Sequence, residues 1–90
     1  MLDLKDRTLN FAVDVRKFLK SIQSNPLIRD DSSQLVRSSG SVGANIIEAI
    51  EGFSKKDFLY RLRICLKEAK ESHYWLMLIN KSNKISNQET

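Results

Sequence analysis

The stretch that decides the fold is KKDFLYRLRICLKEAKESHYWLMLINK, residues 55–81. Its apolar and small side chains recur at steps of three and four residues, the spacing of one face of an α-helix. They are Phe58, Leu62, Cys65, Ala69, Ser72, Leu76 and Ile79. Ser54 and Asp57 stand just before this run with the spacing of a capping box. The sequence therefore predicts a long helix over residues 55–81, followed by a polar and frayed tail over residues 82–90.

An earlier stretch of the chain repeats the same helical spacing. Its apolar face is formed by Leu4, Thr8, Phe11, Val15, Phe18 and Ile22. This pattern predicts a helix over about residues 4–23. The segment Ser24-Asn25-Pro26 is expected to end it, because proline disfavours helical geometry in the residue before it.

Between these two helices the sequence predicts a third, over residues 32–51. The cluster Asp30-Asp31-Ser32-Ser33 offers four good N-cap residues. Gly40 and Gly43 lie inside this helix, where each costs roughly 1 kcal/mol relative to alanine. We expect a continuous helix in which the glycines allow another backbone to approach closely; a break near residues 40–43 is the alternative. Gly52 is expected to form a left-handed C-terminal cap.

Length and composition indicate one all-α domain over residues 1–90, an antiparallel up-down bundle. The chain has 90 residues, 41% of them hydrophobic, and a net charge of +4. It has neither an apolar run long enough to cross a membrane nor an N-terminal signal core. The single cysteine cannot form an internal disulfide, so a reducing cytoplasm is the default location. No nucleophile–base pair or metal-ligand cluster is present, and we therefore expect a protein without catalysis, metal or cofactor.

One segment of the long helix carries apolar side chains on every side. Tyr74, Trp75, Leu76, Met77, Leu78 and Ile79 are consecutive, so they point all around the helix axis. Two other helices cannot easily surround such a segment. We expect a fourth helix or another subunit to cover it. The candidate interface residues are Tyr74, Trp75, Met77 and Leu78.

The opposite side of the same helix carries positive charge with interleaved tyrosines. Lys56, Tyr60, Arg63, Lys67, Lys70 and Tyr74 fall within about 90° of the helix circumference. We name these six residues the basic strip. Such a strip suits RNA or DNA, because the cations neutralise phosphates and tyrosine can stack on a base. Three cations of the first helix, Arg16, Lys17 and Lys20, would extend the strip if that helix lies beside it. The alternative is an ordinary solvated face on which Lys67 pairs with Glu71.

The middle helix carries a polar line and two pairs of small residues. The line is Arg37, Ser41, Asn45, Glu48 and Gly52. It is interpreted as a hydrogen-bond network that fixes helix pairing, with a ligand-binding channel wall as the alternative. The small pairs Ser39/Gly43 and Gly40/Ala44 favour close helix approach within one chain, and a seam between subunits is the alternative.

Three stretches together resemble a known bacterial family. They are the segment R-S-S-G-S-V-G-A-N-I-I-E-A at 37–49, S-K-K-D-F at 54–58, and L-K-E-A-K-E-S-H-Y-W-L at 66–76. Over about residues 3–80 the chain is similar to the S23-like proteins encoded by intervening sequences of 23S ribosomal RNA genes. The resemblance implies an antiparallel four-helix bundle, a ring-like homopentamer and a poorly defined role connected with nucleic acid. A related accessory protein of diversity-generating retroelements has the same architecture, with a basic surface for nucleic acid and reverse transcriptase.

The chain departs from this family in two places. Ala49 stands where glycine often follows the glutamate, and the fourth helix is expected to begin near residues 88–90, where the sequence ends. The expected function is therefore a non-enzymatic, oligomeric helical bundle that binds RNA or DNA. The alternative is a protein–protein scaffold, or accessory subunit, without nucleic-acid contact.

Overall fold

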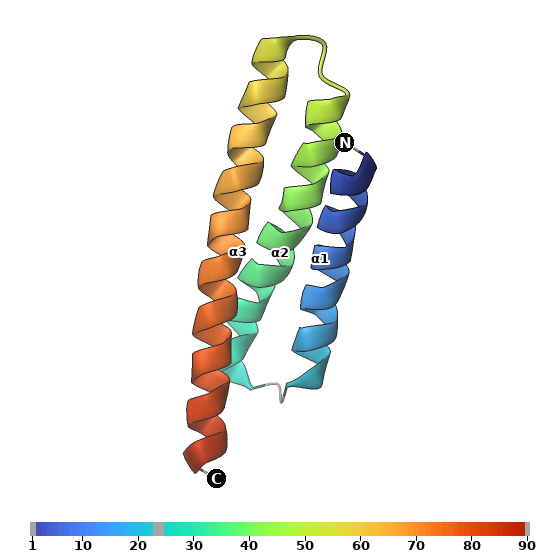
Figure 1. Ribbon diagram of the computed structural model, residues 1–90. Helices are drawn as coiled ribbons and strands as arrows, with labels where there is room; N and C mark the ends of the chain where they lie inside the picture. The colour runs from blue at the N-terminus through green and yellow to red at the C-terminus, as the bar shows by residue number, and fades with distance from the viewer. Residues whose placement is uncertain (1, 23–24, 90) are drawn as a thin grey trace.

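Three α-helices form the computed structural model: α1 (Leu2–Ser21), α2 (Pro26–Ile50) and α3 (Lys55–Glu89). It describes residues 2–22 and 25–89, with side chains over 3–22 and 25–84. Successive helices run in opposite directions, and α2 lies between α1 and α3 (Figure 1). No strand occurs in the described residues, so the all-α class is confirmed. None of the helices in that part of the chain is long and apolar enough to cross a membrane.

The first helix, α1, begins and ends two residues earlier than its apolar spacing predicts. Thr8 and Val15 of the expected face are buried, while Phe11 and Phe18 are half-buried. The predicted last residue of this helix, residue 23, lies outside the described residues. The apolar period therefore identifies the correct face of α1.

The start of α2 corrects the sequence analysis. The helix begins at Pro26 and not near residue 32. Asn25 is the N-cap: its Oδ1 accepts a 3.0 Å hydrogen bond from the backbone N–H of Ile28. Proline is well suited to the first helical position, because its fixed φ is helical and the missing N–H would have had no partner there. The Asp30–Ser33 cluster consequently lies within the helix and caps nothing.

The two central glycines of α2 lie in an unbroken helix, as expected. At Gly43 a Cβ atom would lie 3.2 Å from Thr8 Oγ1, so this glycine lets α1 approach α2 closely. The predicted left-handed cap at Gly52 is wrong, because no described residue has a positive φ. Instead, Glu51 remains right-handed and the Gly52 N–H donates to the carbonyl of Ala49 at 3.2 Å.

The long helix α3 begins where the capping box predicts. Ser54 Oγ accepts a 3.1 Å hydrogen bond from the Asp57 N–H. The helix continues to Glu89, so the prediction of a frayed tail over 82–90 is wrong for 82–89; residue 90 lies outside the described residues. Residues 82–89 contain neither glycine nor proline, and adding a residue to an existing helix is far easier than starting one.

The core lies where the C-terminal half of α3 meets the end of α1 and the start of α2. Val15, Ile28, Leu35 and Ile79 form its centre. Trp75 and Leu76 pack against this centre from α3. The backbones of α1 and α3 do not come into contact within the described residues, because α2 separates them. One side of α3 is consequently fixed on α2, and the basic strip remains at the surface.

Candidate nucleic-acid interface

All six residues of the basic strip are exposed on α3. Tyr60 and Tyr74 are each 60% exposed, so both tyrosine rings are accessible to a partner. The Arg61 guanidinium lies over the Tyr60 ring, 5.6 Å from its centroid, and adds a further positive group beside the strip. The strip therefore presents four cations and two aromatic rings along one face of a single rigid helix.

The pair of Lys67 with Glu71, which belongs to the alternative of a solvated face, does not form. Glu71 Oε2 accepts a 2.8 Å hydrogen bond from Arg37 Nη2 on α2 instead. Among the described residues, the ion pairs are Asp3 with Arg7, and Arg37 with Glu68 and with Glu71. The cations of the basic strip consequently take part in none of them, and their charge is available to an anionic partner.

Arg37 connects α2 to α3 through two carboxylates. Its Nη1 lies 3.2 Å from Glu68 Oε2, and the Glu68 side chain is only 9% exposed. Beside this pair, Ser72 Oγ donates to Ser38 Oγ at 2.8 Å in a fully buried contact. We name Arg37, Glu68 and Glu71 the α2–α3 clasp. Its charge-assisted hydrogen bonds set the register of the two helices.

The polar line on α2 was expected to form a hydrogen-bond network between helices, but most of its hydrogen bonds have another pattern. Ser41 Oγ donates to the Arg37 carbonyl at 3.0 Å, and Asn45 Nδ2 donates to the Ser41 carbonyl at 2.8 Å. These bonds stay within α2. Glu48 is exposed, and within the described residues its side chain takes part in no hydrogen bond or ion pair. Among the residues with described side chains, only Arg37 links the line to another helix, through Glu68 and Glu71, two partners that the spacing did not predict.

The three cations of α1 lie apart from the basic strip. Arg16 extends over α2, where Nη1 reaches Ser39 Oγ and Nη2 reaches the Val36 carbonyl, both at 3.4 Å. Lys17 and Lys20 are exposed on α1. Because α2 lies between α1 and α3, these cations do not continue the strip. These three cations would extend the basic strip only if α1 lay beside the strip, and it does not.

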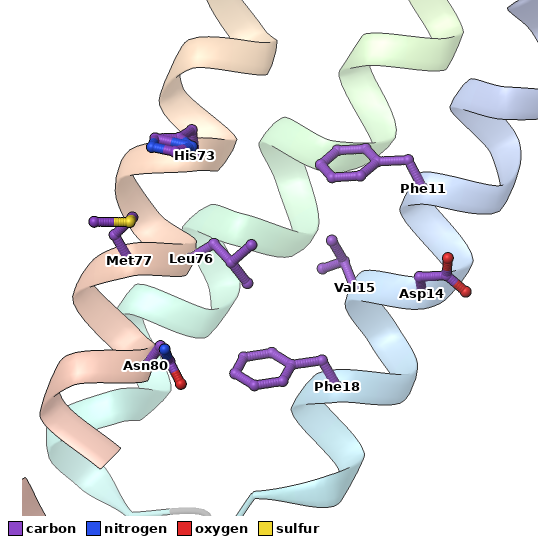
Figure 2. A pocket seen from close by; sticks show the side chains of 8 residues that line it. All are labelled: Phe11, Asp14, Val15, Phe18, His73, Leu76, Met77 and Asn80. Atoms are coloured by element: carbon purple, nitrogen blue, oxygen red, sulfur yellow. The ribbon is translucent and has the colours of Figure 1, made fainter. Parts of the chain in front are cut away.

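Some side chains of the apolar segment 74–79 of α3 are buried in the core, and others line an open groove. Ile79 is fully buried, Trp75 and Leu78 are half-buried, and Met77 is 46% exposed. Met77 and Leu76 line a hollow of about 460 Å³ between α1 and α3. Figure 2 shows Phe11, Val15 and Phe18 extending from α1 toward this hollow, with His73, Met77 and Asn80 along α3. A second hollow, of about 430 Å³, continues it past Phe11, His73 and Leu76. We name the two hollows together the α1–α3 groove.

Cys65 and His73 do not form a reactive pair. Cys65 is half-buried, and burial raises the pKa of its thiol because desolvation disfavours the thiolate. His73 is exposed at the α1–α3 groove. In the part of the chain that the structure describes, no three His, Cys, Asp or Glu side chains are grouped so as to hold a metal ion.

Comparison with known proteins identifies the family. The family model of the 23S rRNA-intervening sequence protein matches residues 1–90. This chain belongs to that family. The resemblance found in the motif at residues 37–49 is thereby confirmed.

One solved structure supports the same assignment for the 23S rRNA-intervening sequence family. It is a protein of unknown function from the S23 ribosomal protein family of Bacteroides thetaiotaomicron VPI-5482, 42% identical to this chain, with a TM-score of 0.76. The match covers 90% of this chain and 75% of the other. A search of curated proteins found no match.

Proposed function

We propose that this chain is a non-enzymatic, cytoplasmic nucleic-acid-binding protein whose contact surface is the basic strip of α3. One observation carries the proposal: Arg37 holds Glu71, the acidic residue that could have paired with Lys67. The strip therefore keeps its full positive charge beside two exposed tyrosines. Phosphates favour such a surface, because each neutralised phosphate releases condensed counterions. The name of the family, which refers to an intervening sequence of 23S rRNA, is compatible with this function.

The salt dependence of binding tests this proposal. With all four strip cations on phosphates of a single-stranded RNA, log K against log salt should have a slope of about −2.8, since each contact contributes about −0.7. Lys67→Gln together with Lys70→Gln should reduce the magnitude of that slope by about 1.4. A slope near zero for the unmodified chain would reject nucleic-acid binding.

A matched control is available on α1. Lys17→Gln together with Lys20→Gln removes the same charge from exposed lysines on another helix. If the strip is the contact surface, this control keeps the original slope. Equal losses in the two double variants would show that net charge, and not the strip, governs binding.

A second candidate function is self-association, favoured by the α1–α3 groove. The chain exposes 6588 Å², whereas a compact monomer of this mass exposes about 5,400 Å². Part of the surplus comes from the rod shape, 54 × 19 × 15 Å, but the groove adds apolar side chains of α1 and α3. The surplus exceeds the roughly 800 Å² that one partner buries in a standard interface. We propose that another copy of the chain covers the groove in a homo-oligomer, for which the family resemblance suggests a pentamer.

Light scattering tests self-association directly. Met77→Glu places a charge in the groove and should lower the mass to that of a monomer. Leu27→Glu, at a position 74% exposed outside the groove, is the control and should leave the mass unchanged. A monomeric unmodified chain would reject this second function, and the groove would then be open to a different protein, as expected of a scaffold.

A further inference from the structure

Beside the basic strip, a depression of about 490 Å³ opens between α2 and α3. Gln34 and Arg37 line it from α2, and Lys70, Glu71, Tyr74 and Trp75 line it from α3. Lys70 and Tyr74 belong to the strip as well. A nucleic-acid backbone that follows the strip therefore passes the mouth of this depression. We name it the α2–α3 depression.

The aromatic wall of the depression suits a flat ring. Tyr74 and Trp75 meet edge to face, with centroids 5.1 Å apart and planes at 75°. Trp75 is held in place because it packs against the core centre of Val15, Ile28, Leu35 and Ile79. Tyr74 is 60% exposed, so a face of its ring remains open. An exposed aromatic face held by a fixed neighbour is the usual platform for an unstacked base.

The charges in the depression favour a base over a phosphate. Arg37 is already bound by Glu68 and Glu71, at 3.2 Å and 2.8 Å. Among the residues that line the depression, Arg37 and Glu71 are therefore paired with each other, and Lys70 is left to hold the phosphate next to the base. Glu71 binds Arg37 through Oε2, which leaves Oε1 as an acceptor. The Gln34 amide offers both a donor and an acceptor.

We infer that the α2–α3 depression receives one unpaired base of a single-stranded nucleic acid, and that it favours a base with an exocyclic amino group. This inference rests on the proposed function, because the strip must hold the neighbouring phosphates. A base inside a duplex is stacked and paired, so only an unpaired base can enter. The free carboxylate oxygen of Glu71 accepts from the amino group of cytosine, whereas thymine presents a carbonyl oxygen at that position.

Trp75 provides the readout, because it is the only tryptophan of the chain. The full chain is titrated at constant salt with oligo(dC), oligo(dT) of equal length, and a duplex with the same number of phosphates. We expect oligo(dC) to bind about tenfold more tightly than the duplex and to quench Trp75 fluorescence. Oligo(dT) should bind with intermediate affinity. The duplex should leave the fluorescence unchanged.

Two tyrosines on the same strip give a matched pair of variants. Tyr74→Ala should remove the preference for single strands over the duplex. Tyr60→Ala should retain it, because Tyr60 is equally exposed but lies outside the depression. Neither change alters charge, so the salt slope should stay the same in both. If Tyr74→Ala fails to fold, the fluorescence response of the unmodified chain still decides the question.

The outcomes separate this inference from the proposed function. Steep salt dependence with equal affinity for single strand and duplex, and no change in Trp75 fluorescence, would overturn the inference and leave the strip as the contact surface. Absence of salt-dependent binding to every probe would overturn both. Tighter binding of oligo(dT) than of oligo(dC) would contradict the role assigned to Glu71.

Discussion

Arg37 on α2 binds Glu71 on α3 at 2.8 Å, and the same guanidinium lies 3.2 Å from the nearly buried carboxylate of Glu68. The residues are 34 and 31 positions apart in the sequence, so this contact exists only when the two helices pair in their native register. The α2–α3 clasp therefore couples the stability of the bundle to the charge of the basic strip, because it withdraws Glu71 from Lys67.

The first prediction concerns the loss of this clasp. Arg37→Met leaves the Glu68 carboxylate nearly buried without a counter-ion, and we expect the free energy of unfolding to fall by about 2 kcal/mol. Arg37→Lys should lose less stability than Arg37→Met but more than none, because an ammonium cannot bind both carboxylates as the guanidinium does. Urea unfolding followed by circular dichroism measures both changes.

The exposed pair Asp3–Arg7 supplies the control for this experiment. Its side chains are 83% and 74% exposed, so Arg7→Met should change stability by less than about 0.5 kcal/mol. Equal effects of Arg7→Met and Arg37→Met would contradict the importance given to the buried carboxylate.

Sequence periodicity located the basic strip but could not identify the partner of Arg37. Residues three and four apart share a helix face whatever the tertiary structure, so spacing alone places Lys56 and Lys70 on one face, opposite the apolar face expected to pack inward. The choice of Glu71 between Lys67 and Arg37 depends on which helix lies beside α3. For the same reason, the separation of Lys17 from the strip could not be foreseen, because it depends on α2 lying between the outer helices.

The second prediction concerns the start of α2. Asn25→Ala removes the side chain that accepts from the Ile28 N–H and should cost about 1 kcal/mol of stability. Ser33→Ala, within the cluster that the sequence analysis took for the cap, lies inside the helix and should stabilise it by a few tenths of a kcal/mol. Thermal or urea unfolding shows which of the two variants is the less stable. If Ser33→Ala were less stable than Asn25→Ala, a helix that begins near residue 32 would be favoured.

Pro26 can be interpreted in two ways, as the end of one helix or as the start of the next. Pro26 disfavours helical geometry in the residue before it and also favours the first position of a new helix. The predicted start near residue 32 depended only on the first property. The second became decisive because Asn25 can cap the helix, and an Asn-Pro pair is the signal that could have located the start at Pro26.

The third prediction concerns pH. Burial raises the pKa of the Cys65 thiol above the 9.0 of a free cysteine, so the unfolded chain releases this proton at lower pH than the folded chain does. The contribution of Cys65 to stability is therefore complete below pH 9.0 and is lost as pH rises through the higher pKa of the folded state.

Cys65→Ser isolates this effect, because serine has a similar size and does not titrate in this range. The difference in unfolding free energy between Cys65 and Cys65→Ser chains should be constant at neutral pH and should shrink above pH 9.0. The reaction of Cys65 with a thiol reagent should also be slower in the folded chain than in urea. A folded thiol that reacts as fast as the unfolded one would contradict the pKa shift.

The last prediction compares the two glycines inside α2. Gly40→Ala adds a Cβ whose nearest neighbour is the flexible Arg16 guanidinium at 3.6 Å, so the gain in helix propensity should stabilise the chain by about 0.5–1 kcal/mol. Gly43→Ala adds the same methyl group 3.2 Å from Thr8 Oγ1, so the Thr8 side chain must shift by a few tenths of an ångström. We expect it to be at least about 1 kcal/mol less favourable than Gly40→Ala. The double variant Thr8→Ala/Gly43→Ala should recover most of that difference, because the crowded hydroxyl is removed. Additive effects of the two substitutions in a double-mutant cycle would show that Gly43 is not required for the approach of α1.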